Sequence, residues 1–221
     1  MIDTNDSEFL SRIEDKGLLS KVCDAKTAAA MFKGGDIIGI SGFTPCGYPK
    51  ITMHELAERM KQTPFQVDIW TGASTGSQID TELVAVNGVR NRMPYQTNAN
   101  LRKAINTGKV NYYDLHLSHV AQQVRAGFFT NVKGEHVTGP DYAVVEVCKI
   151  GPNGELYPTT AIGNSPVYVD TAKKVIVEVN TTQPLDLVGM ADIYMRKNPP
   201  FCEPIPILHA GDRIGTPYIP C

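Results

Sequence analysis

The sequence predicts an α/β protein with a mostly parallel, open sheet flanked by helices. Three short apolar runs each end in a loop that contains glycine, within residues 36–50, 66–77 and 142–154. Short apolar runs bounded by turn residues are typical of buried strands, and helical patterns between them imply right-handed crossovers to parallel neighbours. Ligands of such sheets bind outside the carboxyl ends of the strands. We therefore expect a functional site where these loops meet.

The amino-terminal part of the chain alternates helices and strands. Asp24 can cap a helix through KTAAAMF, which Gly34 and Gly35 end. An apolar strand over residues 37–40 follows directly. After the first glycine loop, ITMHELAERMK has the pattern of an amphipathic helix. The apolar face of this helix is expected to carry Ile51, Leu56 and Met60.

The remaining elements follow from the same signals. The middle of the chain predicts a strand over residues 67–70, a helix over 82–86, a helix over 98–106 that Gly108 ends, a strand over 110–115 and a helix over 118–125. The rest predicts strands over 142–148 and 174–179, with a turn at 151–154 and a return strand from Glu155 that ends near a loop at 163–166. The prolines of residues 195–206 predict an extended connection or an edge strand.

The composition is that of an ordinary globular protein. Of the 221 residues, 42% are hydrophobic and 20% are charged, and the formal net charge is only -2. These values give no reason to expect binding to nucleic acid or to a membrane. The five cysteines are widely spaced without a CxxC pair, so we expect free thiols, no disulfide and no zinc site. The acidic amino terminus does not resemble a secretion signal, which favours a cytoplasmic protein.

The loop from Gly42 to Gly47 is a candidate binding loop. Glycines allow backbone amides to approach a bound carboxylate or thioester oxygen, and the helix that follows presents its positive end to an anion. The alternative is a tight turn from strand to helix without a ligand. The loop matches neither the GxxxxGK[ST] pattern of nucleotide-binding loops nor the GxGxxG pattern of dinucleotide-binding loops.

Hydroxyl side chains on the neighbouring loops are a second group of candidates. Ser74 and Thr75 lie in GASTG, and Thr97 lies in PYQT. Hydroxyl donors can bind a carboxylate without adding a full charge, which suits a site where acids enter, react and leave. Thr75 and Ser77 are better explained as residues that satisfy the backbone of the turn.

Three other patterns are weaker. The spacing of Gly72, Ser74 and Gly76 fits the GxSxG elbow of serine hydrolases, but nothing in the sequence places a histidine base beside Ser74. Asp114, His116 and His119 could suggest a metal, but the two histidines span a predicted junction between strand and helix, so we favour a structural role. Glu146 interrupts an apolar strand and must be paired, protonated or at a cleft; we interpret it as structural.

Several strings resemble the amino-terminal half of the acetyl-CoA hydrolase/transferase family, which includes the succinyl-CoA:acetate CoA-transferases. They are SGFTPCGYPK, TGASTG, PYQTNANLRKAINTGKVNYYDLHLSHVAQ and KKVIVEVN, and the likeness extends from about Ser20 to the last residue. The resemblance implies a CoA-transferase-like fold, no permanently bound cofactor, and coenzyme A and small carboxylates as substrates. It implies substrate binding by Ser74 and Thr97. The residues of the glycine loop expected to join them are Gly42, Phe43, Thr44 and Gly47.

The resemblance also implies a mechanism and a missing part. In this family a glutamate attacks the acyl-CoA, and a glutamyl-CoA thioester forms through a mixed anhydride. The resemblance places that glutamate beyond Cys221, so we expect no catalytic residue here. We expect residues 1–221 to be the amino-terminal domain of a longer, homodimeric protein whose carboxyl-terminal half completes the active site. Acyl-CoA hydrolysis is the alternative reaction. A third possibility is a non-catalytic domain that binds a small carboxylate or a sugar phosphate.

Overall fold

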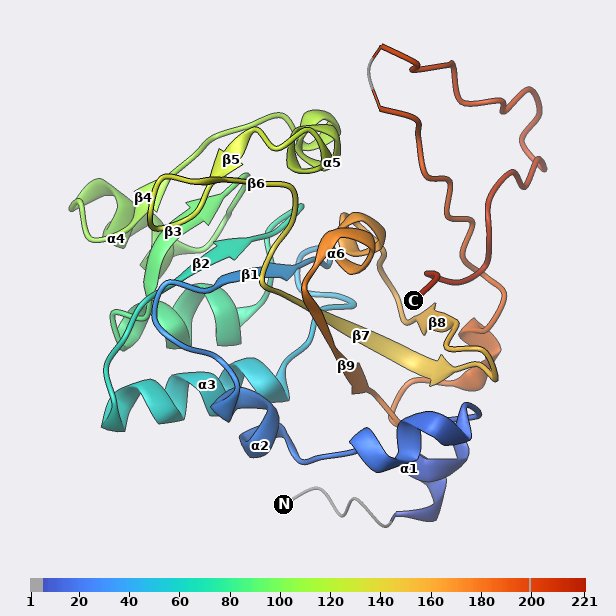
Figure 1. Cartoon of the computed structure of the whole chain (residues 1–221), viewed down its shortest axis with the longest axis horizontal. Helices are drawn as coiled ribbons and strands as arrows, with labels where there is room; N and C mark the ends of the chain where they lie inside the picture. Colours follow the sequence, from blue (N-terminus) through green and yellow to red (C-terminus); the bar gives the residue numbers. More distant parts are fainter. Residues whose placement is uncertain (1–5, 199) are drawn as a thin grey trace.

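A mostly parallel sheet forms the centre of the protein (Figure 1), and the computed structural model describes residues 6–198 and 200–221. Within these residues the strand order is β4-β3-β2-β1-β7-β8. Strand β9 also pairs with β7, on the edge opposite to β1. Only β8 runs antiparallel to its neighbour in this sheet. The strands are β1 (Ile37–Ile40), β2 (Val67–Trp70), β3 (Val89–Met93), β4 (Asn111–Tyr112), β7 (Tyr142–Ile150), β8 (Leu156–Pro158) and β9 (Lys174–Val179). The fold class predicted from the sequence is confirmed.

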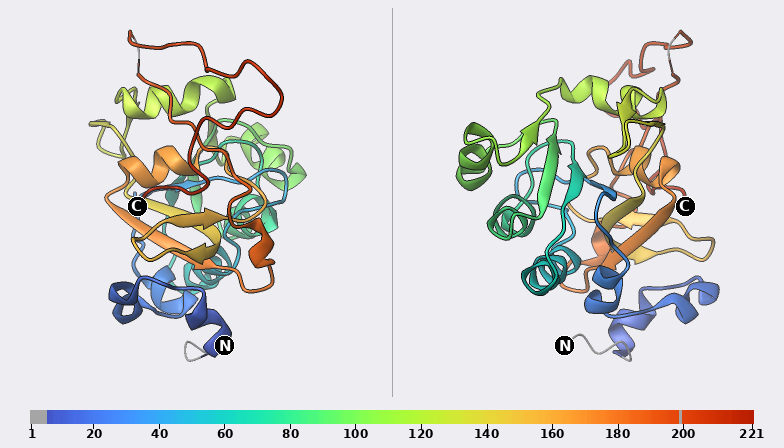
Figure 2. Two further views of the ribbon diagram at one scale, coloured as in Figure 1. Left: turned by 90° about the vertical axis from the view of Figure 1, so that its right-hand side faces the viewer. Right: turned by 60° about the vertical axis from the view of Figure 1, so that its left-hand side comes forward.

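Helices cover both faces of the sheet (Figure 2). One face packs against α2 (Ala25–Ala30), α3 (Ile51–Gln62), the π-helix η2 (Gln78–Leu83) and α4 (Ala99–Asn106). The other face packs against α5 (Leu117–Arg125) and α6 (Ser165–Thr171). The remaining elements are α1 (Ser7–Ser11), η1 (Lys16–Lys21), η3 (Leu185–Leu187) and the small hairpin of β5 (Phe129–Thr130) and β6 (His136–Val137). No helix among the described residues has the length and apolar character needed to cross a bilayer.

The side chains of β1 explain why the sheet is buried on both sides. Ile38 and Ile40 belong to the core under α2 and α3, whereas Ile37 belongs to the core on the other face. Gly39 allows α6 to approach the sheet, since a Cβ atom at this position would lie 2.7 Å from Cγ of Tyr168. A continuous apolar strand with one small residue is therefore what the two helical layers require.

Replacing Gly39 by alanine tests this close approach. The added methyl group would overlap the buried Tyr168 ring and Pro140, so the free energy of unfolding is expected to fall by about 1–3 kcal/mol. Gly211→Ala is the control, because no heavy atom lies within 4 Å of a Cβ atom built there. Urea unfolding followed by circular dichroism measures both variants. Equal midpoints for the two would show that the layers repack without cost.

Most predicted elements are present, with three corrections. Asp24 caps α2 through a 2.7 Å hydrogen bond from the Thr27 amide. Ile51 was predicted to face the core but is 44% exposed, because it lies in the first turn of α3 at the loop. The strand predicted over residues 110–115 shortens to β4, which pairs only with β3. The loop predicted at residues 163–166 already contains the start of α6.

After η3 the described chain has no further helix or named strand. It runs along one side of the molecule, in red in Figure 1. A bridge between Ile193 and Thr216 joins two parts of the segment, and a bridge between Ile219 and Leu156 of β8 returns it to the sheet. This agrees with the irregular connection predicted from its prolines. The segment matters for function because Met190 to Asn198 lies beside the loops described next.

Candidate functional site

Three hydroxyl groups meet at the carboxyl ends of β1, β2 and β3. Ser74 Oγ lies 2.7 Å from Thr44 Oγ1 and accepts a 3.1 Å hydrogen bond from Thr97 Oγ1. The amide of Thr44 also donates to the Ser74 carbonyl at 3.0 Å. Ser74 is completely buried. The strand order places these loops side by side, so residues far apart in the sequence form one cluster of uncharged donors and acceptors.

A fourth segment, residues 159–164, packs against the glycine loop. Ser41 Oγ accepts a 2.8 Å hydrogen bond from the Asn164 amide. A Cβ atom on Gly163 would lie 2.1 Å from Ser41 Oγ, and one on Gly47 would lie 2.5 Å from the Ala161 nitrogen. Both glycines also have positive φ angles, of 52° and 59°. These positions therefore need glycine for backbone conformation and for close contact.

These loops enclose a cavity of about 560 Å³. Its lining comes from the glycine loop, the loop after β2, the segment after β8, α5 and the segment that follows η3. The lining residues are Gly42, Phe43, Gly72, Ala73, Leu117, Pro158, Thr159, Thr160, Ala161, Ile162, Gly163, Asn164, Met190 and Ala191. None of these carries a formal charge. The cavity can therefore take a short aliphatic group beside hydroxyl and amide groups.

A buried ion pair supports the loop after β2. Arg92 on β3 and Asp80 on η2 are both 1% exposed, and Arg92 Nε donates to Asp80 Oδ1 at 2.9 Å. Arg92 Nη1 also donates to Thr71 Oγ1 at 2.7 Å. Tyr168 donates to the Thr71 carbonyl at 2.5 Å, and burial raises the pKa of its phenol, so the hydroxyl stays protonated as a donor. The base of the loop that carries Ser74 is thus fixed from two sides.

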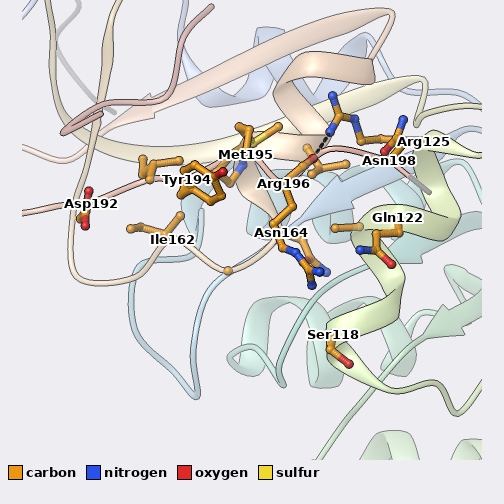
Figure 3. A pocket seen from close by; sticks show the side chains of 15 residues that line it. Ser118, Gln122, Arg125, Ile162, Asn164, Asp192, Tyr194, Met195, Arg196 and Asn198 are labelled. Atoms are coloured by element: carbon orange, nitrogen blue, oxygen red, sulfur yellow. Dashed lines mark hydrogen bonds between the residues drawn. The ribbon is translucent and has the colours of Figure 1, made fainter. Parts of the chain in front are cut away.

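A second cavity of about 290 Å³ lies between α5, α6 and residues 192–198 (Figure 3). It shares Ile162, Gly163 and Asn164 with the larger cavity. Arg125 Nη1 donates to the Arg196 carbonyl at 3.1 Å, the contact drawn as a dashed line in Figure 3. Arg125 also faces Asp170 at 3.4 Å. The 162–164 segment is therefore a wall between two cavities.

In the described residues, neither the GxSxG pattern nor the Asp114, His116 and His119 group has the geometry of a catalytic or metal site. Ser74 Oγ contacts only hydroxyl groups there, and no histidine hydrogen-bonds to it. His54 instead contacts Glu82 at 2.7 Å, and this hydrogen bond raises the pKa of the imidazole. His116 and His119 have ring centroids 5.5 Å apart, yet the described part of the chain holds no group of three side chains suited to a metal ion. The serine-hydrolase and metal interpretations gain no support.

The candidate residues differ in where the structure places them. Thr44, Ser74 and Thr97 come together next to the cavity but do not line it, whereas Gly42 and Phe43 do. Gly47 lies behind the lining, against Ala161. No signal in the sequence marks residues 159–164 as a wall, because the GNSP turn signal at residues 163–166 only overlaps the end of this segment. Asp80 and Arg92 were not predicted either, because no local pattern connects them.

Comparisons with known proteins give a consistent picture. Residues 10–220 match the family described as Acetyl-CoA hydrolase/transferase N-terminal domain. The succinyl-CoA:acetate CoA-transferase of Clostridium kluyveri is 46% identical over 212 residues, covering 95% of this chain and 38% of the relative. The propanoyl-CoA:succinate CoA transferase of Escherichia coli is 39% identical, covering 88% and 39%. An acetyl-CoA hydrolase of Schizosaccharomyces pombe is 35% identical, covering 95% and 40%.

Solved structures show the same fold at low identity. Glutaconate coenzyme A-transferase from Acidaminococcus fermentans superposes with a TM-score of 0.56 at 16% identity, over 72% of this chain and 68% of the other. RipA from Yersinia pestis gives a TM-score of 0.57 at 15% identity, over 83% and 39%. The chain spans about two fifths of the length of the curated relatives named above.

Proposed function

The chain belongs to the acetyl-CoA hydrolase/transferase N-terminal domain family, and from this premise we propose that it supplies the acyl and carboxylate pocket of a CoA-transferase. The meeting of Thr44, Ser74 and Thr97 beside a cavity without charged lining residues carries this proposal. A carboxylate or thioester oxygen accepts hydrogen bonds, and the three hydroxyls can supply them. We assign substrate contacts to these three residues and to Gly42 and Phe43, with Gly47 shaping the loop.

The reaction would run by covalent catalysis from a glutamate in the rest of the protein. Its carboxylate attacks the acyl-CoA carbonyl and expels CoA thiolate, which leaves a mixed anhydride. The thiolate then attacks the glutamyl carbonyl, which releases the first acid and forms a glutamyl-CoA thioester. An acceptor carboxylate reverses both steps, so a new acyl-CoA forms and the glutamate is restored. Water would hydrolyse the anhydride, so the cavity must shield it from solvent.

Exposed apolar side chains support a further domain over this site. Phe43, Leu117 and Met190 line the cavity yet remain largely exposed. Tyr95 and Tyr113, which follow β3 and β4, are exposed as well. Exposed apolar groups gathered at one edge of a sheet are typical of an interface. We therefore assign residues 1–221 to the amino-terminal domain of a longer protein, whose remaining domain completes the active site. We further propose that this protein is cytoplasmic and homodimeric.

Acetyl-CoA hydrolysis is the second candidate because one of the relatives described above carries that name. Hydrolysis and transfer share the attack of the glutamate on acyl-CoA and differ in whether water reaches a covalent intermediate before the carboxylate acceptor does. The deciding factor is then how well the assembled site excludes water. Because exposed groups border the cavity, the exclusion of water would depend on the proposed further domain.

The assay that tests the proposal follows acetyl-CoA in the full-length protein, with and without propionate. We expect propionyl-CoA to form with propionate, and thioester loss without an acceptor to be slower. Rapid loss that does not depend on propionate would favour the hydrolase. The isolated 221-residue chain is expected to show no turnover; robust turnover by it, or binding without turnover in the full-length protein, would contradict the proposal.

A further inference from the structure

Glu146 on β7 is a buried carboxylate that contacts the end of the glycine loop. Its side chain is 1% exposed, and Lys50 Nζ donates to Glu146 Oε2 at 2.5 Å. Lys50 is the last residue before α3, and its Nζ also donates to the Tyr48 carbonyl at 2.8 Å. The ammonium group thus connects the loop backbone to the centre of the sheet.

The same carboxylate contacts the opposite wall of the cavity. Thr159 Oγ1 donates to Glu146 Oε1 at 2.7 Å, and Thr159 lines the cavity beside residues 160–164. Asn180, which follows β9, donates from Nδ2 to Glu146 Oε2 at 3.2 Å. Glu146 is therefore bonded through one oxygen to Lys50, which follows the glycine loop, and through the other to Thr159 in the cavity wall.

A second glutamate fixes the backbone of Lys50. Glu178 is the register partner of Glu146 on the neighbouring parallel strand β9. Its oxygens accept hydrogen bonds from the Lys50 amide at 2.6 Å and the Thr52 amide at 3.0 Å. A carboxylate is favourable at the amino terminus of a helix, where free amides and the helix dipole meet it. The glycine loop therefore ends on two adjacent glutamates of the sheet.

The ion pair of Glu146 and Lys50 needs an explanation other than stability. Taking charges out of water costs about as much as the attraction returns, so a buried ion pair adds little net stability over apolar residues of similar size. It does define geometry, because both oxygens need directed partners. Here those partners are Lys50, which follows the glycine loop, and Thr159, in the wall segment that packs against this loop.

We propose that Glu146 is a positioning residue that sets the separation between the glycine loop and the 159–164 wall, and with it the fit of the acyl group. The expected effect on carboxylate kinetics rests on the proposed function, whereas the expected effect on the two loop segments does not. Glu146 touches no reacting atom in this proposal. Its replacement should alter use of the carboxylate while the enzyme-CoA thioester still forms.

Glu146→Gln in the full-length protein is the test. A neutral amide of the same shape can still bond to Thr159, but it carries no charge to pair with the Lys50 ammonium, so the charge-assisted bond to the loop is lost. Asp68→Asn is the matched control. Asp68 on β2 is 2% exposed and pairs with Arg90, 27% exposed, in a setting as buried as that of Glu146 and Lys50 at 1% and 33%. Asp68 and Arg90 do not line the cavity.

Hydrogen exchange of the full-length variants is read first, because it does not require activity. We expect exchange about tenfold faster over residues 42–50 in Glu146→Gln, the effect of losing one hydrogen bond to a charged group, and little change over 158–164, where the bond to Thr159 is kept. Asp68→Asn should leave both segments unchanged. Unchanged exchange over residues 42–50 in Glu146→Gln, or an equal effect of Asp68→Asn, would overturn the inference.

Kinetics give the second readout. In Glu146→Gln, kcat/KM for the carboxylate should fall about tenfold through misplacement of the loops, while thioester formation from acyl-CoA persists. Failure of Glu146→Gln to form the thioester would contradict a positioning role. If Glu146→Gln does not fold, Thr159→Val keeps the ion pair and should speed exchange over 158–164 alone; no change there would overturn the inference. Absence of turnover in the wild type would instead refute the proposed function and leave the exchange result to decide this inference.

Discussion

Ser74→Ala in the full-length protein is expected to lower kcat/KM for the carboxylate substrate by about 10- to 100-fold, while the affinity for coenzyme A changes little. Ser74 is buried at the centre of the three hydroxyls, with Thr44 and Thr97 as partners. A hydrogen bond to a charged group contributes about 1.5–3 kcal/mol. Removing this hydroxyl removes one such bond and leaves its two neighbours without their shared partner. Initial rates with varied carboxylate and varied acyl-CoA separate the two affinities.

The same chain offers a control of identical chemistry. Ser77 lies three residues further on, is exposed, and donates only to Gln78 Oε1 at 3.3 Å. Ser77→Ala should match the wild type in both kinetic constants. Thr97→Val should resemble Ser74→Ala in direction, because Thr97 Oγ1 bonds to the same oxygen. Equal losses for the carboxylate and for coenzyme A would place Ser74 outside the carboxylate pocket.

Asp80→Asn is expected to lower the free energy of unfolding by about 3–5 kcal/mol, since it leaves the buried Arg92 guanidinium without a counter-charge. Both side chains of the pair are 1% exposed. The guanidinium would keep its bonds to Thr71 Oγ1 and the Met93 carbonyl, which do not neutralise it. Urea unfolding of the 221-residue chain, followed by circular dichroism, measures the change.

An exposed ion pair provides the comparison. Lys61 and Glu58 pair on the outer face of α3. Lys61→Gln removes one partner in the same way but leaves the other in water, so the unfolding midpoint should stay where it is in the wild type. If Asp80→Asn were no more destabilising than Lys61→Gln, the Arg92 site would have to be open to water or to another anion.

The elements that the sequence predicted are those whose signals are local. Asp24 caps α2 from three residues away, and the apolar runs of β1 and β2 need no distant partner. Strand β3 was not predicted because it contains two arginines. Arg90 is neutralised by Asp68 and Arg92 by Asp80, and both acids lie on other elements. Only the folded chain brings these charges together.

The candidate site also has a part that local signals predicted and a part that they did not. The rule that parallel strands present their carboxyl ends at one edge was enough to predict that the loops with Thr44 and Ser74 would meet. Thr97 follows the unpredicted strand β3, and the family resemblance was what pointed to it as a substrate contact. The opposite wall comes from the antiparallel return of β8, whose following segment carries no strand signal of its own. Its contact with the glycine loop depends on Gly47 and Gly163, whose need for glycine appears only when the neighbouring backbone is present.

The uncharged lining of the larger cavity bears on how such an enzyme would turn over. An arginine or lysine there would bind every incoming acid through a strong charge-assisted hydrogen bond. Neutral donors bind an acid less tightly, so the departing acid can be replaced by the arriving one at ordinary concentrations. Exchange between two acids of similar size would then run with comparable ease in either direction, and supply rather than binding strength would decide which thioester accumulates.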